Sequence, residues 1–138
     1  MAEFTGGCAC RAIRYVCTGT PKVSVLCHCR DCQHASGSAC IAAVIVDSAT
    51  LRFTTGDPQY YDTRTDEGRP KRQGFCAACG SPLVVRITES PRIVAITVGS
   101  FDDPSWFRPT ADMWVTSAQP WDSLDPSREK HPTAYHRR

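Results

Sequence analysis

Three things are scarce in this sequence: an excess of charge of one sign, long apolar runs and helical periodicity. The 138 residues include 16 Lys and Arg against 14 Asp and Glu, a formal net charge of +2. We expect no nucleic-acid partner and no membrane-surface partner, because both require a concentrated basic face. No apolar stretch approaches the ~20 residues that span a bilayer.

We also expect no export signal in this sequence. Residues 1–4 include Glu3 and lead directly to Gly6 and Gly7, without the apolar core of a signal peptide. We therefore expect a cytoplasmic protein, and in that reducing compartment clustered cysteines are more often metal ligands than disulfides. Nine cysteines is moreover an odd number, which a fully disulfide-bonded framework would leave unpaired.

Helical patterns are confined to residues 30–35 and 102–107, which argues against a helical fold. Strand-like runs bounded by glycine and proline cover residues 12–17, 23–27, 40–46, 51–55, 59–64, 83–88, 92–98 and 113–116. The sequence predicts a mainly β fold, a single small domain of antiparallel sheets pinned by metal. We place this domain at residues 1–122 and expect residues 123–138 to form a polar tail, partly disordered or wrapped on the surface.

What the sequence does have is clustered cysteine. Seven of the nine cysteines form three groups, which read Cys8-x-Cys10, Cys27-x-Cys29-x-x-Cys32 and Cys76-x-x-Cys79-Gly80. Neighbours this close rarely bridge each other, because a disulfide needs a specific separation of the Cα and Cβ atoms. Short C-x-C and C-x-x-C pairs repeated along a chain are typical of zinc sites.

The first and last groups can combine into one closed site. Cys8 and Cys10 supply two thiolates, Cys76 and Cys79 supply two more, and Gly80 suits the tight turn of a metal-binding knuckle. We expect a structural zinc there, joining segments that are far apart in the sequence.

The triad Cys27, Cys29 and Cys32 then remains on one short segment, with no fourth cysteine at ligand spacing. Its fourth zinc position is expected to be open to water or substrate, which is the arrangement of catalytic zinc sites.

The alternative is a closed, purely structural triad, completed by His28, His34, Cys17 or Cys40. His28 lies between two of the ligands, so its side chain is expected to point away from the metal. Cys17 and Cys40 lie in apolar strand patterns, where a buried inert thiol is the commoner outcome.

The three cysteine groups and their flanking residues resemble the family of glutathione-dependent formaldehyde-activating enzymes, whose domain also occurs in centromere protein V. The resemblance rests on Gly7-Cys8-x-Cys10, Cys27-His28-Cys29-x-x-Cys32 with Ser36-Gly37-Ser38, Phe75-Cys76-x-x-Cys79-Gly80-Ser81, and Val98-Gly99-Ser100-Phe101-Asp102-Asp103-Pro104. It extends over roughly residues 3–122. It implies a small β-rich tent of sheets around zinc.

The resemblance also implies roles. Cys8, Cys10, Cys76 and Cys79 match the ligands of the family's structural zinc, and Cys27, Cys29 and Cys32 match the ligands of its catalytic zinc. The implied substrates are glutathione or a similar thiol and formaldehyde or another small aldehyde. The implied activity is their condensation to an S-hydroxymethyl adduct, classed in reverse as a carbon–sulfur lyase. The sequence leaves the oligomeric state open, with a homo-oligomer among the options.

One position departs from the family pattern: Asp112 stands where many relatives carry a histidine. Candidate cations for an anionic site are Arg11, Arg30 and the pair Lys71-Arg72, with solvated surface charges as the alternative. Asp31 is a candidate to orient His28 or a backbone amide, or a simple loop acid. Core packing and a substrate cleft are the two interpretations of the aromatic side chains Trp106, Phe107, Trp114 and Trp121.

Two other classes of function remain compatible with the sequence. One is a zinc-stabilised binding module without chemistry. The other is a thiol redox or electrophile sensor that uses the triad as reactive thiols.

Overall fold

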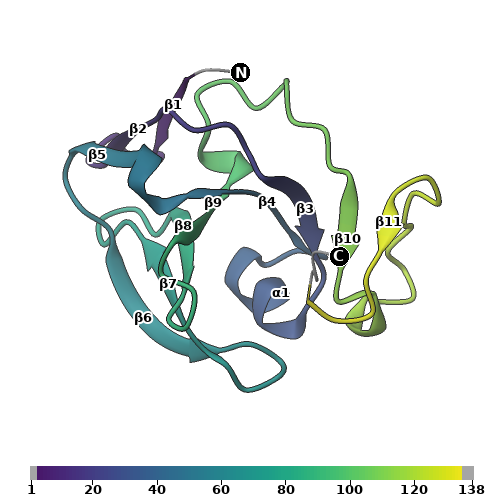
Figure 1. The fold of residues 1–138 in the computed structure, drawn as a ribbon. Helices are drawn as coiled ribbons and strands as arrows, with labels where there is room; N and C mark the ends of the chain where they lie inside the picture. The colour runs from purple at the N-terminus through teal and green to yellow at the C-terminus, as the bar shows by residue number, and fades with distance from the viewer. Residues whose placement is uncertain (1–2, 135–138) are drawn as a thin grey trace.

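The structure, a computed structural model, describes residues 3–134 and consists of two β-sheets and one helix (Figure 1). The small sheet has three antiparallel strands in the order β1 (Phe4–Gly7), β2 (Arg14–Cys17) and β5 (Leu51–Thr55). The large sheet has eight strands. Their spatial order is β11 (Glu129–Lys130), β10 (Ala111–Met113), β3 (Val23–Cys27), β4 (Ile41–Asp47), β9 (Ile93–Thr97), β8 (Pro82–Ile87), β7 (Pro70–Phe75) and β6 (Gln59–Arg64).

The mainly β prediction is confirmed, with one change in the sheet pattern. Strand β10 pairs in parallel with both β3 and β11, so the large sheet is mixed rather than purely antiparallel. Short 3₁₀ turns follow three of the strands, at Ser48–Thr50, Val98–Ser100 and Val115–Ser117. Within residues 3–134, no helix is long and apolar enough to cross a membrane.

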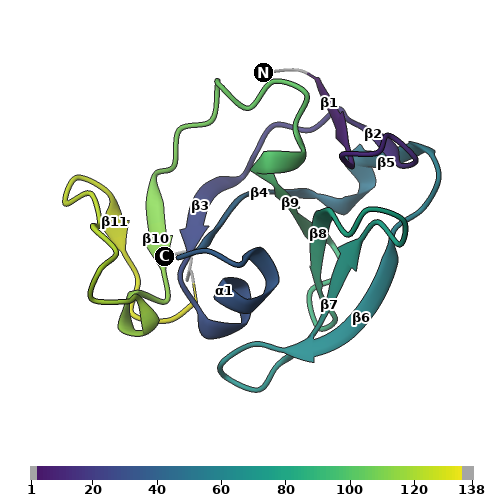
Figure 2. The same ribbon diagram turned by 180° about the vertical axis from the view of Figure 1, so that it is seen from behind.

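The single helix, α1 (Arg30–Ser36), lies on the concave side of the large sheet, between β3 and the hairpin of β6 and β7 (Figures 1 and 2). It begins at Cys29, whose sulfur accepts a hydrogen bond from the backbone N–H of Cys32 at 3.2 Å. It ends at Gly37, whose φ of +67° is readily adopted by glycine. The helix predicted at residues 30–35 is therefore present.

The core has two parts. One lies between the two sheets and is built around Phe4, Tyr15, Val44, Leu83 and Ile96. The other lies beneath α1 and contains the triad cysteines together with Val25, Ile41, Ala43, Ala111 and Trp114. The triad is thus part of the second core. In the four-cysteine group, Cys8 and Cys76 belong to the first core, whereas Cys10 and Cys79 are exposed.

Strands β1, β7 and β11 are absent from the sequence prediction. The predicted strand at residues 113–116 is also displaced, because Trp114 has a left-handed φ of 58° and ends the extended segment after Met113. The segment at 102–107 forms a turn in which Phe107 N–H bonds the Pro104 carbonyl at 3.2 Å.

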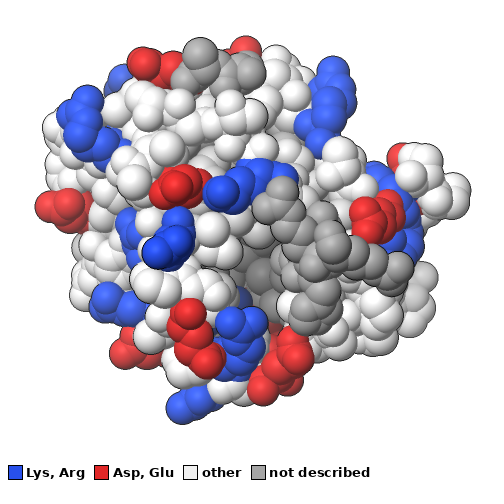
Figure 3. All heavy atoms as spheres, viewed as in Figure 1, with Lys and Arg blue, Asp and Glu red and all other residues white. Residues whose placement is uncertain are grey.

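The described part of the predicted tail lies along the edge of the large sheet, where Glu129 and Lys130 pair with Ala111 and Asp112. The remaining tail residues, 135–138, lie outside the described residues. On the face shown in Figure 3, acidic and basic side chains are interspersed, in keeping with the balanced composition.

Gly6 offers a test of the contact between the sheets. A Cβ at this position would overlap the Ser100 carbonyl oxygen and the Tyr15 hydroxyl group, both of which are buried. We predict that Gly6→Ala lowers the free energy of unfolding by about 2 kcal/mol. Gly99→Ala, whose added Cβ would meet nothing within 4 Å, is the control and should change it by less than about 0.5 kcal/mol. Urea unfolding measures both, and equal effects would contradict the close packing at Gly6.

Candidate metal centres

The first cysteine group gathers at one end of the small sheet. Cys8 and Cys10 follow β1, and Cys76 and Cys79 follow β7. Their four sulfurs lie within 4.8 Å of one another, with 3.6 Å between Cys8 and Cys10 and 3.7 Å between Cys10 and Cys76. Sulfurs at the corners of a tetrahedron around zinc are separated by about 3.8 Å, given a Zn–S bond of about 2.3 Å. The donor set therefore fits a tetrahedral zinc.

Two tight turns hold these sulfurs. Gly80 has a φ of +79°, and its N–H bonds the Cys76 carbonyl at 2.8 Å. Ser81 links the two turns, because its hydroxyl lies 3.1 Å from the Cys79 sulfur and accepts the N–H of Ala9 at 3.0 Å. The Ser81 hydroxyl lowers the pKa of Cys79 to about 5, which favours the thiolate form that binds metal.

The triad is assembled by one strand end and one helix start. Cys27 is the last residue of β3, Cys29 caps α1, and Cys32 lies in the helix's first turn. The three sulfurs lie within 4.8 Å of one another and all three residues are buried. No fourth His, Cys, Asp or Glu in the described part of the chain joins this cluster. The arrangement supplies three of the four donors that zinc takes.

The thiols of the triad interact strongly with one another. Hydrogen bonds from Cys27 and Cys32 lower the pKa of Cys29 well below its usual value. In return, the hydrogen bond with Cys29 raises the pKa of Cys27 to about 12. A metal ion that binds all three sulfurs as thiolates must therefore displace protons from the triad.

The other candidates for closing the triad lie elsewhere. Cys17 is buried in β2, where its sulfur lies 3.6 Å from the Thr50 hydroxyl. Cys40 is half-buried at the start of β4. His34 lies on the outer side of α1, with its Nε2 3.4 Å from the Arg30 guanidinium.

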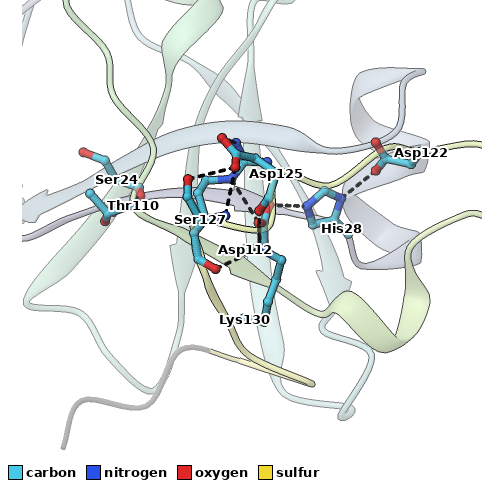
Figure 4. A network of polar contacts seen from close by, with 9 residues as sticks. Ser24, His28, Thr110, Asp112, Asp122, Asp125, Ser127 and Lys130 are labelled. Atoms are coloured by element: carbon cyan, nitrogen blue, oxygen red, sulfur yellow. Dashed lines mark hydrogen bonds and ion pairs between the residues drawn. The ribbon is translucent and has the colours of Figure 1, made fainter.

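His28 points away from the triad sulfurs, as expected from its place between two of them. It is 1% exposed, and both ring nitrogens face carboxylates (Figure 4). Nε2 lies 2.8 Å from Asp112 Oδ1 and Nδ1 lies 2.9 Å from Asp122 Oδ2. Its backbone N–H bonds the Met113 carbonyl at 3.0 Å, which extends the pairing of β3 with β10. His28 is therefore part of a buried polar network rather than a metal donor.

Asp112 is the centre of that network and does not face a substrate cleft. It is fully buried, and Arg128 Nε and Lys130 Nζ lie 3.0 Å and 3.2 Å from its Oδ2. Burial opposes ionisation, but hydrogen bonds from His28, Arg128 and Lys130 lower the pKa of Asp112. Asp112 of β10 thus forms buried ion pairs with Lys130 of β11 and with Arg128 just before that strand.

The structure excludes two of the interpretations considered for charged residues near the triad. Lys71 is not a solvated surface charge. It is 3% exposed, and its Nζ lies 2.6 Å from Asp31 Oδ2. Asp31 orients neither His28 nor a backbone amide, because it binds Lys71 and accepts the Thr63 hydroxyl at 2.8 Å. Although burial opposes its charge, Cys32 and Asp31 raise the pKa of Lys71, which therefore stays an ammonium.

The other candidate cations remain near the surface. Arg72, on the opposite face of β7, pairs with Asp62 at 3.2 Å and is exposed. Arg11 is exposed and lines a cavity of about 530 Å³ beside Cys8. Arg30 lines a second cavity of about 460 Å³ next to α1, together with Gln33, His34, Gln119 and Trp121.

The aromatic side chains divide between core and surface. Trp106 and Phe107 pack against the core between the sheets, and Trp114 belongs to the core beneath α1. Trp121 is 70% exposed at the rim of the cavity lined by Arg30. Core packing is thus the better description of all but Trp121.

Comparison with known proteins identifies the family. The family described as glutathione-dependent formaldehyde-activating enzyme matches residues 3–117, which include all seven clustered cysteines. The chain belongs to this family. A crystal structure of a Rhodobacter sphaeroides protein, a structural genomics target, has a TM-score of 0.55 to it at 17% identity and covers 71% of this chain and 87% of that one. At that identity the likeness shows the fold alone, and no curated protein matches the chain.

The family match covers only part of the buried network around Asp112. It includes Asp112 but ends before Asp122, Arg128 and Lys130. The segment that supplies the other charges around Asp112 and His28 thus lies beyond the matched residues.

Metal analysis separates the two cysteine clusters of this family member. We predict two zinc ions per chain, one fewer in Cys76→Ser and one fewer in Cys32→Ser, because each variant removes one donor from one cluster. Cys40 lies in neither cluster, so Cys40→Ser is the matched control and should retain two zinc ions per chain. Elemental analysis of purified protein measures the content. A single zinc in the unchanged protein would contradict the two-site interpretation.

The buried network gives a second prediction. Asp112→Asn leaves Arg128 and Lys130 beside a neutral amide, and we expect it to lower the free energy of unfolding by about 3 kcal/mol. Asp62→Asn also breaks one carboxylate pair, but that side chain is 85% exposed, so the expected loss is below about 1 kcal/mol. Urea unfolding in excess zinc measures both variants. Equal losses would show that Asp112 has no special role.

Proposed function

We propose that this protein condenses a thiol of the glutathione type with formaldehyde or a similar small aldehyde. In this reaction the thiol sulfur forms a bond to the carbonyl carbon and the C=O π electrons move to the oxygen. The thiol proton ends on that oxygen, which gives an S-hydroxymethyl adduct. The reverse reaction is that of a carbon–sulfur lyase. The observation that carries the proposal is a buried triad of thiols, one donor short of a zinc site, in a member of this family.

The two cysteine clusters have different roles in this proposal. Cys8, Cys10, Cys76 and Cys79 would hold a structural zinc, because their four sulfurs complete a tetrahedral donor set. Cys27, Cys29 and Cys32 would hold the second zinc with one position left for substrate. Zinc bound by three thiolates supplies a soft Lewis-acid position that favours a further sulfur ligand over water.

The chain's own residues supply orientation and exclusion of water. The triad lies in an apolar core with Val25, Ile41 and Trp114, so a thiol that reaches it leaves bulk solvent. Gln33 fixes α1 by donating to the carbonyl oxygens of His28 at 2.7 Å and Ser117 at 3.0 Å. Holding two reactants in such a fixed site lowers the entropic part of the barrier.

The cavity beside α1 supports a thiol that carries carboxylates. Arg30 follows Cys29 directly and lines this cavity, where Trp121 presents an exposed ring. A guanidinium group suits carboxylate recognition, and an exposed aromatic ring suits contact with a planar peptide group.

The burial of the triad weighs against the sensor alternative. Sensor cysteines are exposed to solvent so that oxidants can reach them. Here the three residues are between 3% and 8% exposed. Zinc release on mild oxidation would revive that alternative.

The decisive measurement is the exchange rate between formaldehyde hydrate and the S-hydroxymethyl adduct of glutathione at equilibrium, followed by NMR. This condensation also proceeds without an enzyme, so the comparison is with buffer alone. We predict faster exchange with the zinc-loaded protein, and loss of that effect in Cys29→Ser, which removes a triad donor. Cys40→Ser is the control and should keep the effect. Zinc-loaded, folded protein that leaves the exchange rate at its buffer value would instead support a binding module.

A further inference from the structure

Strand β7 buries a lysine beneath the helix that carries the triad. Lys71 stands opposite Thr63 of β6 and Ile87 of β8, on the concave side of the large sheet. Its ammonium lies 2.6 Å from Asp31 Oδ2, and the Thr63 hydroxyl donates to the other oxygen of the same carboxylate at 2.8 Å. Among the described residues, Lys71 is the only buried lysine or arginine.

The ion pair with Asp31 does not by itself account for this burial. Removing two charges from water costs about as much as their attraction returns, and an apolar pair of similar shape would stabilise the interior as well. Asp31 lies between Cys29 and Cys32 in the first turn of α1, so the pair ties the ammonium to the turn that carries two triad ligands. Although burial opposes the charge of Lys71, Cys32, Asp31 and Cys29 together raise its pKa.

The negative charge of a zinc-bound triad explains why a lysine is buried here. Three thiolates around a divalent zinc carry a formal charge of −1, and a fourth thiolate brings it to −2, while Asp31 adds a further −1. The nearby arginines do not offset this charge from inside, because Arg30 and Arg72 are both exposed and solvent screens their charges. A buried cation is needed, and β7 provides one.

We propose that Lys71 is the charge-balancing residue of the triad. Asp31 and Thr63 hold its ammonium in place, and the ammonium stabilises a zinc–thiolate centre at Cys27, Cys29 and Cys32. Lys71 thereby sets that centre's affinity for zinc and for a fourth, thiolate ligand. The inference rests on the proposed function for the identity of that fourth ligand.

The test is zinc affinity, measured in the full chain by competition with chelators of graded strength. In Lys71→Met the triad site should bind zinc about 10- to 100-fold more weakly, which is the range typical of residues that support metal ligands. The four-cysteine site is an internal control and should be unchanged. Arg72→Met removes one positive charge from the outer face of the same strand and should leave both affinities at their original values.

The two partners of the ion pair distinguish charge balance from simple structural support. Lys71→Met and Asp31→Asn both break the pair. If the pair only supports α1, both variants weaken zinc binding at the triad. Asp31→Asn keeps a side-chain oxygen that accepts a hydrogen bond from the ammonium, so Lys71 stays in place while one negative charge is removed. If Lys71 balances the thiolates, the zinc affinity of the triad is then unchanged or higher in Asp31→Asn, opposite to Lys71→Met. Weakening in both variants would overturn the proposal. If Lys71→Met does not fold, Lys71→Gln and Asp31→Asn provide the same comparison.

The fourth ligand is tested separately with cobalt in place of zinc. Glutathione or 2-mercaptoethanol entering the triad site changes the sulfur-to-cobalt absorption, and Lys71→Met should weaken this binding at least 10-fold. Zinc affinity decides the role of Lys71 even if the protein does not accelerate the condensation. Conversely, full condensation activity together with unchanged zinc and thiol affinities in Lys71→Met would refute this inference and leave the proposed function intact.

Discussion

The alternation of side chains at the end of β3 is the constraint on which the triad depends. Cys27 and Cys29 lie on either side of His28, so extended backbone directs the two sulfurs to one face and the imidazole to the other. The sulfurs enter the core beneath α1, while His28 enters the network of Asp112 and Asp122. Because these residues are adjacent in the chain, any shift of His28 moves both ligands. The polar network therefore fixes the position of sulfurs that it does not touch.

Strand β7, which packs beside the triad helix, could not be predicted from the sequence. Its residues read Pro-Lys-Arg-Gln-Gly-Phe, a polar segment that carries no strand signal. In the structure its concave face buries Lys71 and Gln73, and Arg72 remains outside. A polar inner face is unusual for a half-buried strand, where apolar residues normally alternate inward. A buried lysine on this face is reasonable next to a zinc–thiolate centre that carries a net negative charge. Strand β7 thus departs from the usual pattern at a place where the proposed chemistry would need it.

Prediction from sequence succeeded where the determinants are local. The strands at residues 23–27, 51–55 and 59–64 have the predicted bounds, because alternation and bounding turns are local features. The triad spans six residues, so its spacing alone brought its sulfurs together. The burial of Lys71, the network of Asp112 and the pairing of β11 depend on residues distant in the sequence, and no local pattern carries them. The partnership of Cys8 and Cys10 with Cys76 and Cys79 is also long-range, but donor count and spacing were sufficient to indicate it.

The two clusters differ in how they depend on the fold. The four-cysteine cluster joins segments 66 residues apart, and Cys10 and Cys79 remain exposed, so its metal would close a long loop of the chain. The triad closes only a short loop and gains little from that effect. Its sulfurs are instead enclosed in the core beneath α1, together with side chains from β3, β4 and β10. Metal bound at the first cluster would thus stabilise the sheets, and the assembled sheets would in turn supply the enclosure and the buried cation that the triad requires.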